Sequence, residues 1–307
     1  MAKFPLKLTA DVLFQYLFSS AGSEPGLLSF INAVRTDAHC PPAQEIHVRN
    51  PFNPKRFLND KLSILDVKAT DSTGRTYDIE MQTLNKIALR ERILLYWSRI
   101  YNEQIQTGEE YERLNPVVSI VLTQFNMFPE LKDLHNMFHT VAVKQPECKF
   151  SDHFQLHVLE LAEPKLSQLS RLYNPLYRWL EFLYKGNEKT EEEMDELIQN
   201  DSGMKVAYEK FRDFTDDEYL RELAVRRYFG EMDRRAEQSY ARNEGHQEGR
   251  QEGLADSLIQ LLNFKFPEAF TPAMEAAVRR IPEISRLNAL FAEALKAENL
   301  DVIEKML

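Results

Sequence analysis

The sequence predicts an α/β fold, with a mixed core over residues 1–165 and an α-helical C-terminal half. Residues 62–70 and 75–83 alternate between polar and apolar side chains around a short turn, which is typical of an antiparallel hairpin. Beyond residue 165, apolar residues recur at helical spacing and the sequence lacks strand signals. The expected order of elements in the core is helix, antiparallel hairpin, helix and strand.

Composition and charge indicate a soluble globular chain and exclude several classes of protein. Of its 307 residues, 43% are hydrophobic and 28% are charged, and the formal net charge is −10. Cys40 and Cys148 lie far apart, which excludes a disulfide framework and a thiolate zinc site and fits the cytoplasm. No apolar run reaches the roughly 20 residues of a membrane-spanning helix, and no cleavable leader is found, so we expect no membrane partner.

The negative charge is concentrated in one segment. Residues 186–222 hold 13 acidic and 5 basic side chains, a net charge of −8, whereas residues 44–70 carry a net charge of +2. Ordinary solvated surfaces explain both segments. The basic segment also leaves a local contact with nucleic acid open, because total charge does not describe how charge is distributed.

Four elements are expected in the core besides the hairpin. Residues 11–18 form an amphipathic helix that ends before Gly22, and a proline-rich loop follows over residues 40–54. Apolar residues at helical spacing predict a second helix over residues 86–107, which Gly108 ends. An apolar run over residues 116–122 predicts a buried strand, and residues 154–161 are a further strand candidate.

The helical half divides into three parts. Helical patterns cover residues 166–243, and a small helical unit is expected over residues 254–307. Between them, residues 244–253 carry glycine at every fourth position, namely Gly245, Gly249 and Gly253. Because each glycine costs a helix about 1 kcal/mol relative to alanine, the repeat is either a flexible linker or a helix through which two chains form a homodimer.

The hairpin brings two carboxylates together. With a three-residue loop that ends at Gly74 in the left-handed conformation, Asp66 faces Glu80 and Lys68 faces Asp78, while the other face is apolar. Adjacent carboxylates repel each other unless a cation or a proton lies between them. Mg²⁺ prefers one or two carboxylates together with waters and a phosphate. The alternative is a solvated polar strand face that Lys68 screens.

Several segments taken together resemble one protein family. They are Asp11-Val12-Leu13-Phe14, Leu65-Asp66-Val67, Tyr77-Asp78-Ile79-Glu80-Met81-Gln82, His157-Val158-Leu159-Glu160-Leu161 and Trp179-Leu180-Glu181-Phe182-Leu183. Over about residues 1–253 the chain resembles the recombination-promoting nuclease/transposase family of the PD-(D/E)XK nuclease superfamily. This resemblance implies a restriction-endonuclease-like core.

The resemblance also implies a set of site residues. The superfamily pattern, an Asp followed by Glu-x-Lys, maps onto Asp66 and Glu80-Met81-Gln82, so Asp66, Glu80 and the Met81 carbonyl would hold Mg²⁺ or another divalent cation. Gln82 stands where the superfamily has lysine, and it would orient the water that attacks the phosphodiester. Asp11 resembles an acidic residue that such folds add from the opening helix, and a helix cap explains it equally well.

Basic residues near the predicted site are candidates for DNA binding. Arg90, Arg92 and Arg99 lie along the helix after the hairpin, where they would contact phosphates or, as an equal alternative, form i, i+4 ion pairs. Lys68 either substitutes for the missing lysine or forms a salt bridge with Asp78, which is the favoured interpretation.

Other chemical patterns in the sequence are weaker. His135 with His139, and His153 with His157, have the i, i+4 spacing of zinc ligands on a helix, but they lack the glutamate of a metalloprotease, which favours surface or core histidines. No P-loop, dinucleotide fingerprint or nucleophile elbow occurs, so no organic cofactor is expected.

Together these observations predict a Mg²⁺-dependent DNA endonuclease associated with recombination or transposition. The alternative is a DNA-binding or oligomeric scaffold protein that has lost catalysis and acts in mobile-element biology or in defence against foreign DNA. Metal-dependent cleavage of DNA separates the two.

Overall fold

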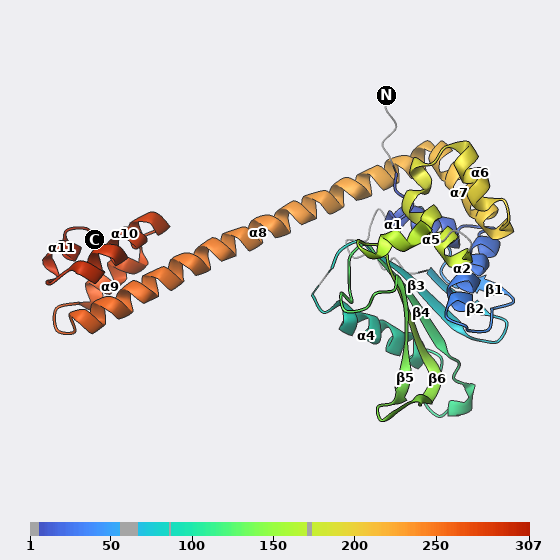
Figure 1. The fold of residues 1–307 in the computed structure, drawn as a ribbon, viewed down its shortest axis with the longest axis horizontal. Helices are drawn as coiled ribbons and strands as arrows, with labels where there is room; N and C mark the ends of the chain where they lie inside the picture. The colour runs from blue at the N-terminus through green and yellow to red at the C-terminus, as the bar shows by residue number, and fades with distance from the viewer. Residues whose placement is uncertain (1–5, 56–66, 86, 171–173) are drawn as a thin grey trace. The chain divides into compact units, whose positions relative to one another are not determined.

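The computed structural model describes residues 6–55, 67–85, 87–170 and 174–307 of the chain. The chain divides into two compact units, Met1–Tyr228 and Phe229–Leu307 (Figure 1). The first unit contains a sheet with helices packed on it, and the second unit is helical. The expected change from a mixed α/β core to a helical C-terminal half is therefore present.

A six-stranded mixed sheet forms the centre of the first unit. Its strands are β1 (Ile46–Val48), β2 (Val67–Asp71), β3 (Thr76–Gln82), β4 (Val117–Thr123), β5 (His135–Ala142) and β6 (Gln145–Glu160). They lie in the order β1-β2-β3-β4-β6-β5 (Figure 1). β4 runs parallel to β3 and β6, and the other neighbouring strands are antiparallel. The carboxyl ends of β3, β4 and β6 thus meet at one edge of the sheet.

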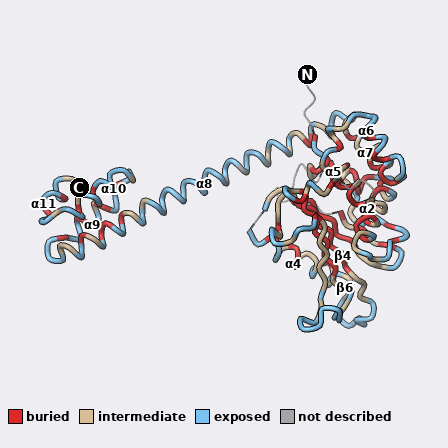
Figure 2. Tube along the Cα trace, in the orientation of Figure 1, coloured by how far each residue is buried: buried red, intermediate tan, exposed pale blue. Residues whose placement is uncertain are grey.

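Helices cover both faces of this sheet. One face is covered by α1 (Asp11–Ser19), α2 (Glu24–Asp37), α5 (Pro175–Lys185) and α7 (Ser202–Asp216). These helices share a hydrophobic core with Tyr77, Ile79 and Met81 of β3. On the other face, α4 (Leu89–Asn102) packs Leu89 and Ile93 against β4 and β6. The central strands are consequently buried on both sides, as Figure 2 shows.

Glycine allows α2 and α7 to pack closely. A Cβ atom at Gly203 would lie 2.4 Å from Cβ of Ser29 and 2.5 Å from the carbonyl oxygen of Pro25. A Cβ atom at Gly26 would lie 3.2 Å from the carbonyl oxygen of Gly203. A larger residue at position 203 would therefore push the two helices apart.

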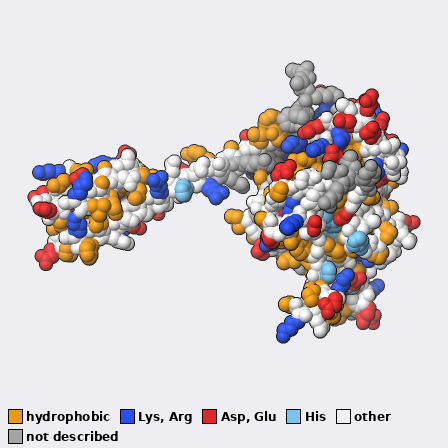
Figure 3. Space-filling model, viewed as in Figure 1, with side chains coloured by type: hydrophobic (Ala, Val, Ile, Leu, Met, Phe, Trp, Pro, Cys, Tyr) orange, Lys and Arg blue, Asp and Glu red, His pale blue; other side chains and the backbone are white. Residues whose placement is uncertain are grey.

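Short helices complete the first unit. They are η1 (Tyr111–Arg113), η2 (Lys165–Ser170), η3 (Gly186–Glu188) and α6 (Glu191–Ile198). Thr190 begins α6 with a capping box, in which its hydroxyl accepts from the Glu193 backbone N–H and the Glu193 carboxylate accepts from the Thr190 backbone N–H. Acidic side chains gather over α6 and α7 in Figure 3, within the segment that carries the net charge of −8.

The second unit has a hydrophobic core of its own. Its helices are the C-terminal part of α8 (Glu218–Lys265) with α9 (Pro272–Arg279), α10 (Ile284–Lys296) and α11 (Asp301–Glu304). Leu258 of α8, Val278 of α9 and Leu290 of α10 are fully buried in this core. The Lys265 ammonium donates hydrogen bonds to three carbonyl oxygens at the end of α10, where a cation is favourable.

The glycine repeat is helical rather than a loop. Residues 244–253 lie inside α8, and, apart from the adjacent residues and backbone of the helix itself, no atom of the described chain comes within 4 Å of where a Cβ of Gly245, Gly249 or Gly253 would lie. The preceding helix therefore continues through the repeat, which agrees with the helical alternative and not with a flexible linker. Association of two chains through it stays a prediction.

Three elements differ from the expectations. No helix was expected at α2 and no strand at β1 or β5. His135 and His139, whose spacing would suit zinc ligands on a helix, in fact lie on β5. Residues four apart on a strand are about 13 Å apart, so neither histidine pair binds one ion in the way that a helix would allow. None of the described helices has the length and apolar composition needed to cross a membrane.

Candidate active site

The two faces of β3 carry different kinds of side chain. Tyr77, Ile79 and Met81 enter the core under α1 and α2, whereas Asp78, Glu80 and Gln82 lie on the face that α4 covers. These three polar residues, here called the polar face of β3, are only 2%, 3% and 9% exposed. For the β3 half of the hairpin, a solvated polar face, the alternative left open by the sequence, is therefore wrong.

The register of the hairpin agrees with the prediction wherever the structure describes it. Lys68 pairs with Asp78 and Val67 with Ile79, and Gly74 has φ of +86°. Asp71 holds the turn by accepting hydrogen bonds from the Thr73 backbone N–H at 2.9 Å and the Thr73 hydroxyl at 2.6 Å. Burial raises the pKa of Asp71, but these hydrogen bonds outweigh burial and hold the pKa below its usual value.

Asp66 lies outside the described residues, so its predicted pairing with Glu80 stays a prediction. The hairpin on either side of the turn is nevertheless fixed, because an apolar face on one side and a polar face on the other leave one register possible.

Glu80 and Gln82 interact directly. The Gln82 side-chain amide donates a hydrogen bond from Nε2 to Oε2 of Glu80 over 2.8 Å. Across the sheet, Glu80 is opposite Val121 and Gln82 is opposite Thr123 of β4. The amide therefore fixes the orientation of the Glu80 carboxylate while leaving its charge in place.

Asp78 is a second buried acid, beside Glu80. Burial, and then the negative charge of Glu80, raise the pKa of Asp78 to about 7, and the nearby Lys68 ammonium opposes this rise. Lys68 is half-buried on β2 and faces Asp78 in register, as predicted. The favoured salt bridge between the two side chains is not formed, and Oδ1 of Asp78 has no hydrogen-bond partner among the described residues. Two neighbouring buried carboxylates with one nearby lysine form an oxygen-rich, negatively charged group that suits a hard divalent cation.

Sequence analysis missed a buried ion pair at the same edge of the sheet. Glu160, which ends β6, is paired with Lys165 and accepts hydrogen bonds from the backbone N–H groups of Met127 at 2.6 Å and Phe128 at 2.9 Å. Lys165 also donates to the Phe128 carbonyl at 3.0 Å. The charge of Glu160 is thereby matched, so this pair anchors the loop after β4.

Asp11 is bound to a cation from α8. Its Oδ2 accepts a hydrogen bond from Nε of Arg227 at 2.8 Å, and Ala10 rather than Asp11 occupies the cap position of α1. The Thr9 hydroxyl accepts from the Gln124 side chain at 2.7 Å, and the Gln124 backbone N–H donates to the Gln82 carbonyl at 3.0 Å. The start of α1 therefore lies beside the carboxyl ends of β3 and β4.

The three arginines of α4 have different environments. Arg90 donates to the Met127 carbonyl at 2.7 Å, and its guanidinium lies 4.3 Å from the centre of the Phe128 ring. Arg92 lies over the ring of Tyr96 at 5.5 Å. Arg99 forms an exposed ion pair with Glu103 at 3.1 Å, which is the i, i+4 pair that the sequence offered as an alternative.

Histidines form a buried network elsewhere. Nε2 of His135 lies 3.0 Å from Nδ1 of His157, and Nδ1 of His135 lies 2.6 Å from the Asp37 carboxylate, which Asn174 also contacts. Burial, followed by the charges of His135 and Arg35, lowers the pKa of His157 to about 3. His157 is therefore a neutral core residue at pH 7, as favoured by the sequence.

Within the described ranges, no three His, Cys, Asp or Glu residues form a group that could hold a metal.

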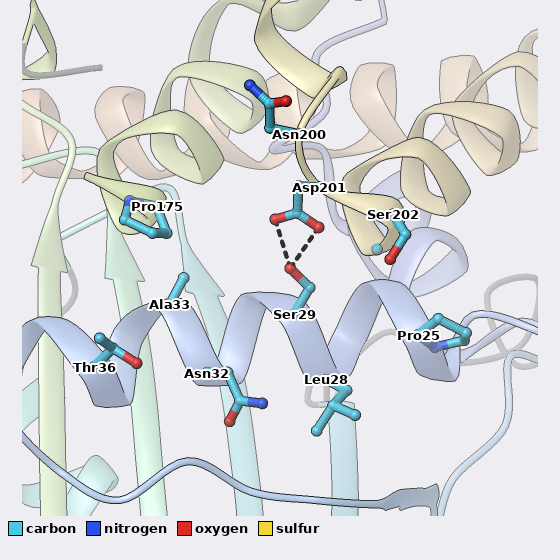
Figure 4. A pocket seen from close by; sticks show the side chains of 11 residues that line it. Pro25, Leu28, Ser29, Asn32, Ala33, Thr36, Pro175, Asn200, Asp201 and Ser202 are labelled. Carbon is cyan, nitrogen blue, oxygen red and sulfur yellow. Dashed lines mark hydrogen bonds between the residues drawn. The ribbon is translucent and has the colours of Figure 1, made fainter. Parts of the chain in front are cut away.

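A surface depression of about 480 Å³ lies between α2, the start of α5 and the start of α7 (Figure 4). Ser29 and Asp201 face each other in it, with the Ser29 hydroxyl 2.8 Å and 2.7 Å from the two carboxylate oxygens. Asp201 also caps α7 by accepting from the Met204 backbone N–H. These polar groups satisfy one another, and they lie on the helical layer that covers the face of the sheet opposite Glu80.

Comparison with known proteins assigns a family. The sequence model of the family described as PD-(D/E)XK nuclease family transposase matches residues 8–241, which include all six strands and the polar face of β3. No curated protein and no solved structure matches the chain significantly. Because the match covers well over half of the chain, this protein belongs to the PD-(D/E)XK nuclease family of transposases.

Proposed function

We propose that the chain is a Mg²⁺-dependent DNA endonuclease that hydrolyses phosphodiester bonds during recombination or transposition of DNA. The observation that carries this proposal is the buried Glu80 carboxylate on the central strand β3, held by the Gln82 amide at 2.8 Å. Glu80-Met81-Gln82 lies within the segment that matches the nuclease family.

Asp66, Glu80 and the backbone carbonyl of Met81 would hold the cation. Their donors are all oxygens, which suit Mg²⁺ rather than a thiophilic metal. The Oδ1 atom of Asp78, buried beside Glu80 without a hydrogen-bond partner among the described residues, supports a cation at this place. When bound, Mg²⁺ would supply charge stabilisation to the phosphate that is cleaved.

Gln82 has two tasks in this proposal. One N–H of its amide orients Glu80, and the second N–H and the carbonyl remain available to orient the attacking water. A glutamine supplies no positive charge to the phosphate, in contrast to the lysine of the superfamily pattern. Asp11 would add a further carboxylate at the same edge, provided that Arg227 releases it.

DNA would be bound by Lys68 and by the arginines of α4. Arg92 and Arg99 are positioned on the solvent side of this helix, where phosphate contacts cost little. Arg90 is held by the Met127 carbonyl and the Phe128 ring, which supports a role in fixing the loop in addition to any contact with DNA. A homodimer formed through α8 would bring two sites to the two strands of a duplex.

The substitution of glutamine for lysine also favours a second candidate. A chain without a positive charge at position 82 would bind DNA as a scaffold while cleaving it slowly or not at all. Nicking of supercoiled plasmid separates the two functions. The nuclease nicks it with Mg²⁺ and loses this activity in Asp66→Ala, whereas the scaffold binds the plasmid and leaves it supercoiled under all conditions.

A further inference from the structure

A pair of buried polar atoms lies next to Glu80 and takes part in none of the contacts described so far. Asp78 of β3 and Ser119 of β4 are direct partners in the parallel register, and they are 2% and 3% exposed. Within the described part of the chain, Oδ1 of Asp78 and Oγ of Ser119 each lack a hydrogen-bond partner. Buried polar groups nearly always have partners, so two orphans side by side indicate that a further group binds between them.

The position of this pair connects it with Glu80. Asp78 and Glu80 are two residues apart on one strand, so their side chains leave the same face and their Cα atoms are about 7 Å apart. Ser119 lies on that same face of β4, two residues before Val121, which is opposite Glu80. Two carboxylates and a hydroxyl are thus directed to one side of two neighbouring central strands.

The chemistry of this group favours a cation. It offers oxygen atoms alone, and its two carboxylates carry up to two negative charges in a buried place. Lys68 faces Asp78 from the other neighbouring strand, and Oδ1 of Asp78 still has no hydrogen-bond partner among the described residues. Hard divalent ions bind such oxygen sets, with water and phosphate completing the shell.

On this basis we propose that Asp78 is a further carboxylate ligand of the divalent cation held by Glu80, with the Ser119 hydroxyl as a neutral oxygen donor on the neighbouring strand. The proposal rests on the proposed metal-dependent function and adds two residues to its site. It also changes the interpretation of Asp78, which in the sequence had been the expected salt-bridge partner of Lys68. Lys68 and the cation would then both lie beside the Asp78 carboxylate.

The direct test measures Mn²⁺ binding to the purified full chain without DNA. Titration calorimetry gives the affinity, and electron paramagnetic resonance gives the concentration of the free ion. Asp78→Asn preserves shape and removes the charge, and it should weaken Mn²⁺ binding by at least about 10-fold, as Glu80→Gln should. Ser119→Ala should weaken binding less, by a few fold. The control Asp71→Asn changes an equally buried acid whose carboxylate is already bonded to Thr73 and Tyr77, and it should leave Mn²⁺ affinity unchanged.

Thermal unfolding supplies a second readout that does not depend on cleavage. In metal-free protein, Asp78→Asn removes a buried charge that lies beside Glu80, so its melting temperature should rise above the wild-type value. The rise in melting temperature that Mn²⁺ gives the wild type should be reduced or lost in the variant. If Asp78→Asn unfolds more easily than wild type, or does not fold, the acid has a structural role and the proposal is wrong.

The outcomes distinguish this inference from the proposed function. If Glu80→Gln loses Mn²⁺ binding and Asp78→Asn retains it at wild-type affinity, Asp78 is not a ligand and the metal-dependent function stands. If the wild-type chain itself binds no Mn²⁺, both the inference and the proposed function are contradicted.

Discussion

Gln82 donates its side-chain amide to Glu80, two residues earlier on the same strand, over 2.8 Å between Nε2 and Oε2. Both side chains are buried beneath α4 in the middle of a six-stranded sheet. Lysine at position 82 would bring a positive charge to this carboxylate, whereas glutamine brings an N–H without charge. Glu80 is thus oriented by its neighbour through an uncharged donor.

Replacing Gln82 should separate orientation from charge. Gln82→Ala removes the hydrogen bond to Glu80, and the rate of plasmid nicking should fall by about 10- to 100-fold, the usual effect of losing a group that orients a metal ligand. Gln82→Lys should retain or raise the rate. The control Gln199→Ala, at the exposed end of α6, should leave the initial rate unchanged. A wild-type rate in Gln82→Ala means that the amide has no catalytic role.

Acid should destabilise the fold through His157. Burial and the charges of His135 and Arg35 lower its pKa to about 3 in the folded chain, against about 6.5 for an unfolded histidine. Between these values the unfolded state binds more protons, so the free energy of unfolding falls as the pH falls below about 6.5, by up to about 1.4 kcal/mol per pH unit. Urea unfolding between pH 7 and pH 5 measures how steeply the free energy of unfolding depends on pH. In His157→Gln this dependence should be smaller, by an amount that corresponds to about one bound proton. An equal slope in the two proteins would refute this explanation.

Two glycines should respond in opposite ways to alanine. Gly203→Ala places a Cβ atom 2.4 Å from Ser29, so the α2–α7 contact must open, at a cost of about 1–3 kcal/mol in the free energy of unfolding. Gly249→Ala meets open space in the exposed part of α8 and should stabilise the helix by about 1 kcal/mol. Thermal and urea unfolding of both variants check this. Destabilisation by Gly249→Ala would indicate a contact at that face that only glycine permits.

DNA binding should depend on salt through the basic residues around the hairpin and α4. Lys68→Gln, Arg92→Gln and Arg99→Gln should each weaken binding and lower the slope of log affinity against log salt by about 1, because each removes one phosphate contact. Fluorescence anisotropy with a labelled duplex in EDTA measures this slope without cleavage. Arg279→Gln, in the second unit and outside the family match, is the matched control and should leave the slope unchanged. An affinity independent of salt would contradict the predicted surface.

Local chemistry made the hairpin predictable. Gly74 provides the left-handed residue of a three-residue loop, and one apolar face then fixes Lys68 opposite Asp78. The burial of Asp78 and Glu80 was not predictable in this way. It depends on β4, which pairs with β3, and on β6, which pairs with β4. Both strands come much later in the chain than β3, and they complete the sheet under α4.

The features that the sequence did not predict have similar physical causes. β5 was overlooked because residues 135–142 show no regular alternation of polar and apolar side chains, and most of this edge strand is half-buried. The pair between Glu160 and Lys165 depends on backbone N–H groups of Met127 and Phe128, more than 30 residues earlier. α2 did have a signal, a proline at its first turn followed by apolar residues at helical spacing.

The central claim is that Glu80 holds the divalent cation on which hydrolysis of DNA depends. Its most direct test is the initial rate of nicking of supercoiled plasmid by wild-type chain, Glu80→Gln and the exposed control Glu196→Gln on α6, with Mg²⁺ and with EDTA. The account predicts nicking by wild type and control with Mg²⁺ alone, and a loss of at least about 100-fold in Glu80→Gln at unchanged fold. Nicking by Glu80→Gln at the wild-type rate, or nicking that persists in EDTA, would contradict it.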